Sequence, residues 1–358
     1  MLAAIALTSL WSCGEDDGSS TGDLRRQTLD SLGTSVIMPM YRDIEAQSAA
    51  LNTAAQAFCA APDTQGLTAT RQAWWDARAP WKMSEVLAFG PYDEEPVRLG
   101  PKMDFWPIRE TSVQGVLEGD GDLTASTVAE LGAASKGFPA IEWLLYADGA
   151  LEEFENEPRR CAYLTALTED LATNAQTMRE AWDPEMGDYL GELVRAGEGS
   201  EAFDTLPMAV GEVANRMAYM CENIRRDKLN PPLGAATTVP QPETAESRFS
   251  GRSVQDIIDN LRGVEALFRG QYGDQQGEGF AAYATQRGID LEPAFDEALN
   301  TSITALEAIP GPLTEAVSQN PEAVEAALEP LRQLQRVIQT DMLGALGVST
   351  TFNDNDGD

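Results

Sequence analysis

Glu142 is the residue whose surroundings first suggest chemistry. It stands in the apolar run SKGFPAIEWLLY, at positions 135–146, between Ile141 and Trp143. An isolated charge is costly to bury, so a carboxylate here needs a partner or a function. Pro139 suits the first turn of a helix, where its missing N–H costs nothing. Glu142 then lies near a helix start, where free N–H groups favour an anion. A helix-stabilising role and a ligand-binding role both stay open.

The chain contains no histidine among its 358 residues. This absence excludes Ser-His-Asp and Cys-His triads, histidine-based zinc sites and imidazole general bases within the chain. Any reaction or metal site must therefore use carboxylates, hydroxyls, arginine, tyrosine or backbone groups.

The charge is strongly negative. Asp and Glu number 58 against 25 Lys and Arg, which gives a formal net charge of −33. Only four of the basic residues are lysines, at positions 82, 102, 136 and 228. Such a surface repels nucleic acid and anionic lipid headgroups and attracts cations. It suits an extracytoplasmic setting, and no nucleic-acid partner is expected.

The first residues, MLAAIALTSLWSC, are apolar but too few to span a bilayer, and the polar GEDDGSSTGD follows at once. Leu10–Cys13 resembles a bacterial lipobox, although residues 1–12 lack the basic start of a signal peptide. We expect residues 1–13 to be a lipoprotein signal ending at a lipidated Cys13, and residues 14–23 to be a tether. The acyl chains would anchor the protein to a membrane, on the periplasmic side of the envelope and at the outer membrane.

That compartment is oxidising, so a disulfide is expected among the three remaining cysteines. Cys221 lies inside the helical run RMAYMCENI and is expected to be a buried thiol. Cys59 and Cys161 each lie next to a helix break, where disulfide geometry is easier to satisfy, so we favour that pair.

Apolar residues at spacings of three and four predict long helices, and strand-like alternation is nearly absent. The fold class is therefore all-α, with bundle packing of antiparallel neighbours. A segment at 89–107 is poorly helical yet rich in aromatic residues, which is typical of a packed loop that builds a site. A proline-rich stretch covers 230–247. We expect helices at 24–36, 38–60, 67–88, 108–118, 124–132, 138–147, 158–182, 201–229, 253–269, 278–287, 291–308 and 321–346.

Several motifs occur in a fixed order: an Arg/Trp-rich helix with RQAWWDARAPWKMSEVLAFGP, then DFWP, GFPAIEWLLY, RRCAYL, ESRFSGRS and LGVSTTFNDNDGD. Over residues 24–358 the chain resembles the imelysin-like family of bacterial periplasmic proteins. The resemblance implies two related helical bundles with a site between them, which we place at 24–200 and 201–358. The family motif Gly-x-His-x-x-Glu maps onto Gly137 and Glu142, but Pro139 stands at the histidine position.

The resemblance also implies which residues line the site. We expect Glu142, Glu85 and Asp104 to offer metal ligands, for a hard cation such as iron or calcium. The alternatives are packing for the tryptophans, helix capping for the serines, and pairing of Glu85 with Arg78 or Lys82. The full set of candidate ligand-binding residues is Gly137, Pro139, Glu142, Trp81, Glu85, Asp104, Trp106, Glu246, Ser250 and Ser253.

Three functions are consistent with the sequence. One is a lipid-anchored binding protein that holds a cation, metal chelate or small ligand between the bundles, with iron-uptake components as partners. The second is a metallopeptidase, the activity for which imelysins were named. The third is a non-catalytic scaffold of the cell envelope. The missing histidine argues against the peptidase, because a thermolysin-like zinc site needs imidazole ligands.

Overall fold

The computed structural model describes residues 16–94 and 97–350, and for residues 16–20 it describes the backbone only. Within these ranges the chain is almost entirely helical, as predicted. A short antiparallel hairpin, β1 (Gln271–Tyr272) with β2 (Gln275–Gln276), is the only sheet in the described part of the chain. The predicted lipidation site at Cys13 and the signal segment 1–13 lie outside the described residues.

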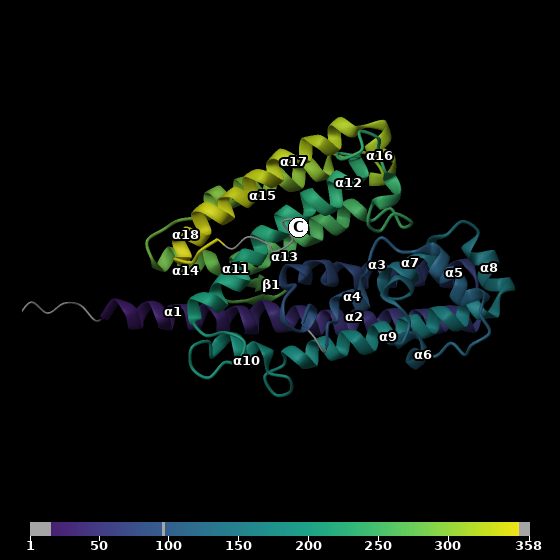
Figure 1. Cartoon of the computed structure of the whole chain (residues 1–358), viewed down its shortest axis with the longest axis horizontal. Helices are drawn as coiled ribbons and strands as arrows, with labels where there is room; N and C mark the ends of the chain where they lie inside the picture. Colours follow the sequence, from purple (N-terminus) through teal and green to yellow (C-terminus); the bar gives the residue numbers. More distant parts are fainter. Residues whose placement is uncertain (1–15, 95–96, 351–358) are drawn as a thin grey trace, which may run out of the picture.

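The first half of the molecule is built on four long helices. They are α1 (Asp16–Leu32), α2 (Met38–Ala60), α3 (Thr64–Ser84) and α9 (Pro158–Trp182). A π-helical turn, Gly33–Ile37, joins α1 to α2, and α2 packs along both α3 and α9 (Figure 1). Shorter helices pack around these four: α4 (Gly100–Met103), α5 (Glu110–Glu118), α6 (Ala125–Ala129), α7 (Gly137–Tyr146), α8 (Ala150–Asn156) and α10 (Tyr189–Val194).

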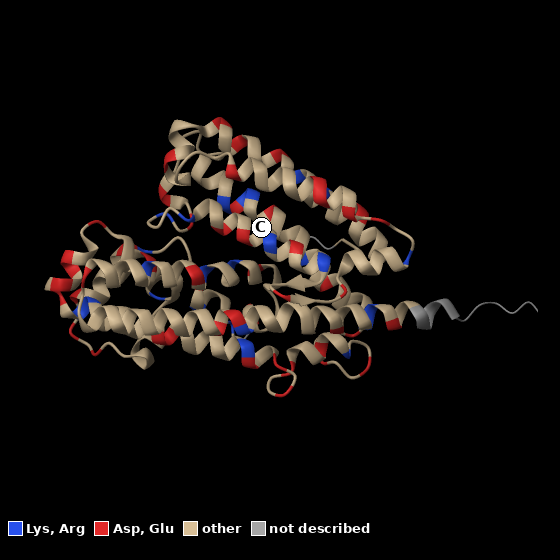
Figure 2. Ribbon diagram, turned by 180° about the vertical axis from the view of Figure 1, so that it is seen from behind, with Lys and Arg blue, Asp and Glu red and all other residues tan. Residues whose placement is uncertain are grey.

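The second half lies beside the first and packs α11 (Leu206–Asn223) and α13 (Ser253–Arg269) with α15 (Glu292–Glu307) and α17 (Pro321–Arg336) (Figure 1). π-helical turns, Ile224–Leu229 and Val337–Met342, extend α11 and α17. Acidic residues are spread over the helices and loops of both halves (Figure 2). The remaining helices are α12 (Asn230–Leu233), α14 (Phe280–Gln286), α16 (Leu313–Gln319) and α18 (Leu343–Leu346).

The two halves meet closely where α3 crosses α13. Gly263 makes the approach possible, because a Cβ there would lie 2.0 Å from the carbonyl oxygen of Met83. Only the missing side chain of glycine lets one backbone come so near another. The inner face of α3 is thereby shared between the core of the first half and the junction with the second.

The predicted helical faces are the buried ones. In α9 the apolar residues spaced by three and four all lie in the core: Leu164, Leu167, Leu171, Ala175, Met178 and Trp182. Helices α9 and α13 occur at their predicted bounds. Burial of such a stripe supplies most of the stability of a helix in a folded protein.

Some bounds differ from the prediction. The helix predicted from 201 begins at Leu206, because Thr205 caps it by accepting a hydrogen bond from the Met208 N–H. Helix α1 begins at Asp16, so residues 16–23 of the expected tether are helical. Helices α8, α10 and α16 were not predicted, because each has only six or seven residues.

Cys59 and Cys161 form a disulfide that joins the end of α2 to the start of α9, and Cys221 is buried as a free thiol. No described helix is both long and apolar enough to cross a membrane.

Candidate functional site

Gly137 and Pro139 set the start of α7. Gly137 has a φ of +70°, and a Cβ there would lie 2.2 Å from the carbonyl oxygen of Met103. Glycine alone combines the left-handed backbone with so close an approach. Pro139 occupies the first turn, where no N–H is needed. These two residues fix the position from which Glu142 leaves the helix.

Glu142 is buried, with 3% of its surface exposed, and its side chain reaches the second half of the molecule. Its Oε1 atom accepts hydrogen bonds from the backbone N–H groups of Phe249 (3.1 Å) and Ser250 (2.8 Å) and from the Ser250 hydroxyl (2.7 Å). No hydrogen bond reaches Oε2 from the residues that the structure describes. Glu142 thus links the two halves and is not held by the N–H groups of its own helix.

Burial raises the pKa of Glu142 to about 7. The hydrogen bonds from Ser250 and the positive charge of Arg78 act in the opposite direction and only partly offset the desolvation. Near neutral pH the group therefore exists in both protonation states. Because Oε1 already accepts three hydrogen bonds, the proton of the neutral form belongs on Oε2, which can then donate.

A small cavity of about 10 Å³ lies beside Glu142, at the junction of the two halves. This is room for about one water molecule. Residues of the second half, 245–249, form one wall. The other walls come from the first half, and they are lined by Arg78, Trp106, Pro107, Ile108, Pro139 and Glu142.

Arg78 stands at the centre of a buried ion-pair network next to this cavity. Its guanidinium lies 2.8 Å from Asp104 Oδ2, 2.8 Å from Glu246 Oε1 and 3.2 Å from Asp256 Oδ2. One helical turn further along α3, Lys82 is also fully buried. The network joins α3 and the 104 loop of the first half to the second half.

Lys82 places its ammonium among three carboxylates. Nζ lies 2.5 Å from Glu85 Oε1, 3.1 Å from Asp104 Oδ2 and 2.5 Å from Glu246 Oε1. The indole N–H of Trp81 donates to the same Asp104 oxygen at 2.9 Å. Three donors of the ammonium are therefore used, one on each acid.

The second half supplies further cations. Lys228 Nζ lies 2.9 Å from Glu85 Oε2 and 3.0 Å from Glu246 Oε2, and it donates to Asn260 Oδ1 at 2.7 Å. Asn260 in turn donates to Glu85 Oε2 at 2.8 Å. Every acid around Lys82 thus has more than one polar partner.

Arg252 extends the network along α13. It pairs with Asp256 and lies 2.7 Å from Asp259 Oδ2. The Ser247 hydroxyl donates to Asp256 Oδ2 at 2.5 Å. Asp256 is thereby shared between Arg252 and Arg78 of the first half.

The network keeps Glu246 and Lys82 charged. Burial alone would raise the pKa of Glu246, but Lys228, Lys82 and Arg78 hold it well below its usual range. Burial would likewise lower the pKa of Lys82, yet Asp104, Glu246 and Glu85 raise it well above its ordinary value. Opposite charges therefore outweigh desolvation at Glu246 and Lys82.

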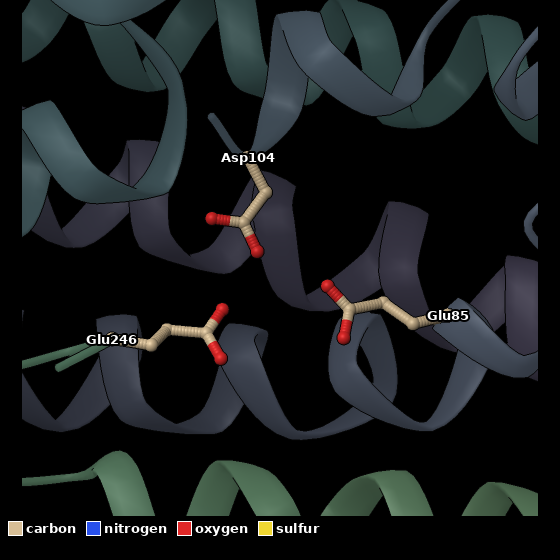
Figure 3. Close-up of side chains that lie close together, drawn as sticks. All are labelled: Glu85, Asp104 and Glu246. Carbon is tan, nitrogen blue, oxygen red and sulfur yellow. The ribbon is translucent and has the colours of Figure 1, made fainter. Parts of the chain in front are cut away.

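The three carboxylates around Lys82 have the spacing of a metal site. Glu85, Asp104 and Glu246 point toward one another, with one oxygen of each within 4.8 Å of the others (Figure 3). However, the Lys82 ammonium already contacts all three. A bare cation would have to displace this hydrogen-bonded amine, so the residues as arranged do not fit one. Of the three predicted metal ligands, Glu85 and Asp104 belong to this group, whereas its third member is Glu246 and Glu142 lies outside it.

The other predicted residues take different positions. Trp106 lines the cavity. Trp81 is fully buried, stacks on Tyr92 and donates its indole hydrogen bond to Asp104. Ser250 binds Glu142. The Ser253 hydroxyl donates to the Glu246 carbonyl, which positions that acid.

Sequence reasoning named Arg78 and Lys82 only as alternative partners of Glu85, and the structure shows the Lys82 pair. It missed the pairing of both residues with Asp104 and Glu246, and the contributions of Lys228 and Arg252. One signal was present in the scarcity of lysine. Of the four lysines, those at 82, 136 and 228 are buried. In so acidic a chain, a lysine that is not needed for solubility is a candidate for an internal ion pair.

The fold agrees with comparisons to known proteins. The imelysin family model (peptidase M75) matches residues 37–338, which is most of the chain. The chain belongs to the imelysin family.

Individual relatives share the fold along nearly the whole length. Iron-regulated protein A of Synechococcus elongatus is 29% identical over 320 residues, covering 87% of this chain and 83% of the relative. A crystal structure of a candidate iron-regulated protein A precursor from Parabacteroides distasonis superposes with a TM-score of 0.76 at 19% identity, over 91% of this chain and 94% of that one. An imelysin-like protein from Psychrobacter arcticum gives 0.75 at 19% identity, over 92% and 98%.

Proposed function

We propose that this chain is an imelysin-family binding protein of the bacterial cell envelope that holds a small oxygen-rich ligand, such as an anionic metal chelate, between its two halves. Its role would be in iron acquisition. The relation to iron-regulated protein A supports the link to iron. The junction of the halves supports the binding position, because ligand sites in proteins favour such interfaces.

One observation carries the proposal. Glu142 is held by the second half through Oε1, while Oε2 has no hydrogen-bond partner among the described residues and the side chain borders a cavity. A polar atom of a buried side chain is normally satisfied by water or by a ligand. Glu142 is thus placed to contact a bound molecule and to exchange a proton with it.

The charges around the cavity favour an anionic or neutral ligand over a bare cation. Arg78 and Arg248 line the cavity together with Glu246 and Glu142, whereas the other acids that pair with Arg78, Asp104 and Asp256, do not line it. Glu142 is partly protonated near neutral pH, because burial raises its pKa to about 7. Guanidinium groups recognise carboxylate oxygens well, and such oxygens coat a ferric chelate.

A chelate larger than a water molecule requires the wall 245–249 to move. Arg248 pairs with Glu110 of the first half and lies over the ring of Phe249. The pair is partly exposed, so it contributes about 1 kcal/mol or less. Movement of the 248–249 part of the wall is therefore energetically accessible, whereas Glu246 stays in its buried ion pairs with Arg78, Lys82 and Lys228.

The peptidase alternative has no support in the residues of the site. Pro139 stands at the motif histidine, and its ring offers neither donor nor acceptor. The buried acids nearby are committed to ion pairs with Lys82, Lys228 and Arg78.

Location belongs to the same proposal. The sequence Leu10–Cys13 supports a lipid anchor, and the acidic surface supports an extracytoplasmic position at the outer membrane. When cells are grown with an alkynyl fatty acid, the wild-type protein should carry the label and the Cys13→Ala variant should not.

Thermal unfolding at pH 7 tests the ligand site. Ferric citrate should raise the Tm of the wild type with a saturable dependence on concentration, while citrate alone or manganese chloride should raise it less. Glu142→Gln should lose most of the ferric citrate effect. Glu155→Gln, which removes one exposed acid of α8, should keep this effect.

Two outcomes contradict the proposal. An equal shift in wild type and Glu142→Gln would place the ligand elsewhere. A larger shift with manganese chloride, lost in Asp104→Asn, would show that a bare cation binds the carboxylates around Lys82 after all.

A further inference from the structure

A second cavity of about 360 Å³ lies at a different part of the junction between the halves. It is bordered by the segment 89–94, by α10, by residues 202–203 and by the first turns of α11. None of its residues borders the cavity at Glu142. Its volume is in the range of small-molecule sites and far exceeds that of a metal ion.

Aromatic side chains form one wall of this cavity. The Tyr189 ring packs at 6.2 Å from Phe89 and 6.3 Å from Phe203, measured between ring centroids. Gly90, with a φ of +57°, is what admits the tyrosine, because a Cβ there would lie 2.2 Å from its ring. The apolar lip is Met208, which is 51% exposed. The wall is therefore built by a specific backbone conformation.

Acidic side chains line the same cavity. Glu212 is paired with Arg216 at 2.7 Å, and this guanidinium lies over the Phe89 ring, 5.7 Å from its centroid. Asp93 and Glu94 are exposed, and neither forms an ion pair with a described residue. The Tyr189 hydroxyl lies 3.5 Å from Glu94 Oε1. The lining thus carries two uncompensated negative charges beside an aromatic face.

We propose that this cavity binds an organic cation, an ammonium or guanidinium group, between the Tyr189 ring and the carboxylates of Asp93 and Glu94. Aromatic faces attract such cations, and adjacent carboxylates add charge complementarity. The guanidinium of Arg216 over Phe89 shows that this environment already accommodates one cation. The site is independent of the ligand proposed at Glu142, so either can fail without the other.

Isothermal titration calorimetry at low salt tests the site with two probes. Choline chloride represents a free organic cation, and the tripeptide acetyl-Gly-Arg-Gly-amide represents an arginine carried by another chain. At least one should bind saturably, and the tighter one identifies the source of the cation. Sodium chloride at matched ionic strength should not reproduce the heat.

Variants separate ring, charge and fold. Tyr189→Leu should weaken binding about 2- to 30-fold, while Tyr189→Phe, which keeps the ring, should bind nearly as the wild type does. Glu94→Gln should weaken binding roughly two- to fivefold. Asp204→Asn, an exposed acid of the neighbouring loop that does not line the cavity, is the matched control and should have no effect.

The inference is overturned if neither probe binds saturably to the wild type. It is also overturned if Tyr189→Leu and Tyr189→Phe bind equally, since the aromatic face would then contribute nothing. Equal weakening by Glu94→Gln and Asp204→Asn would show general charge attraction in place of a site. Circular dichroism of each variant confirms that the fold is retained.

Discussion

Replacing Glu142 by glutamine should change how the stability of the protein depends on pH. Burial raises the pKa of this group from an ordinary value of 4.5 to about 7 in the folded chain. A carboxyl group with a folded pKa above its unfolded value binds its proton more tightly when folded. Its contribution to stability is therefore present at low pH and is lost as pH rises between the two values.

The size of the effect follows from linkage. Each pKa unit corresponds to about 1.4 kcal/mol, so between pH 5 and pH 8 the free energy of unfolding should fall by about 2.5 kcal/mol through this group. Glu142→Gln lacks the titration but keeps an oxygen that can accept from the N–H groups of Phe249 and Ser250. Other groups titrate alike in both proteins. The free energy of unfolding of the wild type, measured relative to that of the variant, should therefore fall by about 2.5 kcal/mol between pH 5 and pH 8.

Urea unfolding at half-unit steps from pH 5 to pH 8 measures this difference, with Glu155→Gln as a control for the loss of one exposed charge. The free energies of unfolding of the wild type and of Glu155→Gln should change in parallel with pH. If Glu142→Gln also runs parallel to the wild type within about 0.5 kcal/mol, Glu142 titrates as an exposed acid does, and the reasoning from its burial is refuted.

Three further perturbations address the network and the fold. Lys82→Met leaves three carboxylates, of which Asp104 and Glu246 are buried, without their shared ammonium. It should lower the free energy of unfolding by about 3–5 kcal/mol in urea. Added manganese should restore part of this loss, and an unchanged stability would contradict the assigned ion pairs. Gly137→Ala forces a Cβ into the carbonyl of Met103 at positive φ and should cost more than about 1 kcal/mol in the same assay. The double variant Cys59→Ser, Cys161→Ser should lose about 2–5 kcal/mol of the free energy of unfolding, seen as a lower Tm, because the disulfide closes a long loop. As a control, the wild type with its disulfide reduced should have the same Tm as this variant.

The site could be predicted only in part from the sequence. Glu142 was identified because it is an acid inside the apolar run 135–146, and such a run can be recognised from neighbouring residues alone. Its partner Ser250 was identified through a motif and not through physics. The pairing of Lys82 with Glu85 was an alternative that local helix spacing offered. Its contacts with Asp104 and Glu246 were missed, since no spacing along the chain brings position 246 near.

The sequence by itself determined the helices, the imelysin family and the absence of imidazole chemistry, because apolar period, motif order and residue type are all local properties. The long-range packing of α3 against α13 decided the rest. It set which cation faces which acid, and it buried Glu142 against the 249–250 backbone so that its pKa rises. Pairing and desolvation depend on the distance between atoms, and that distance exists only once the two halves have come together.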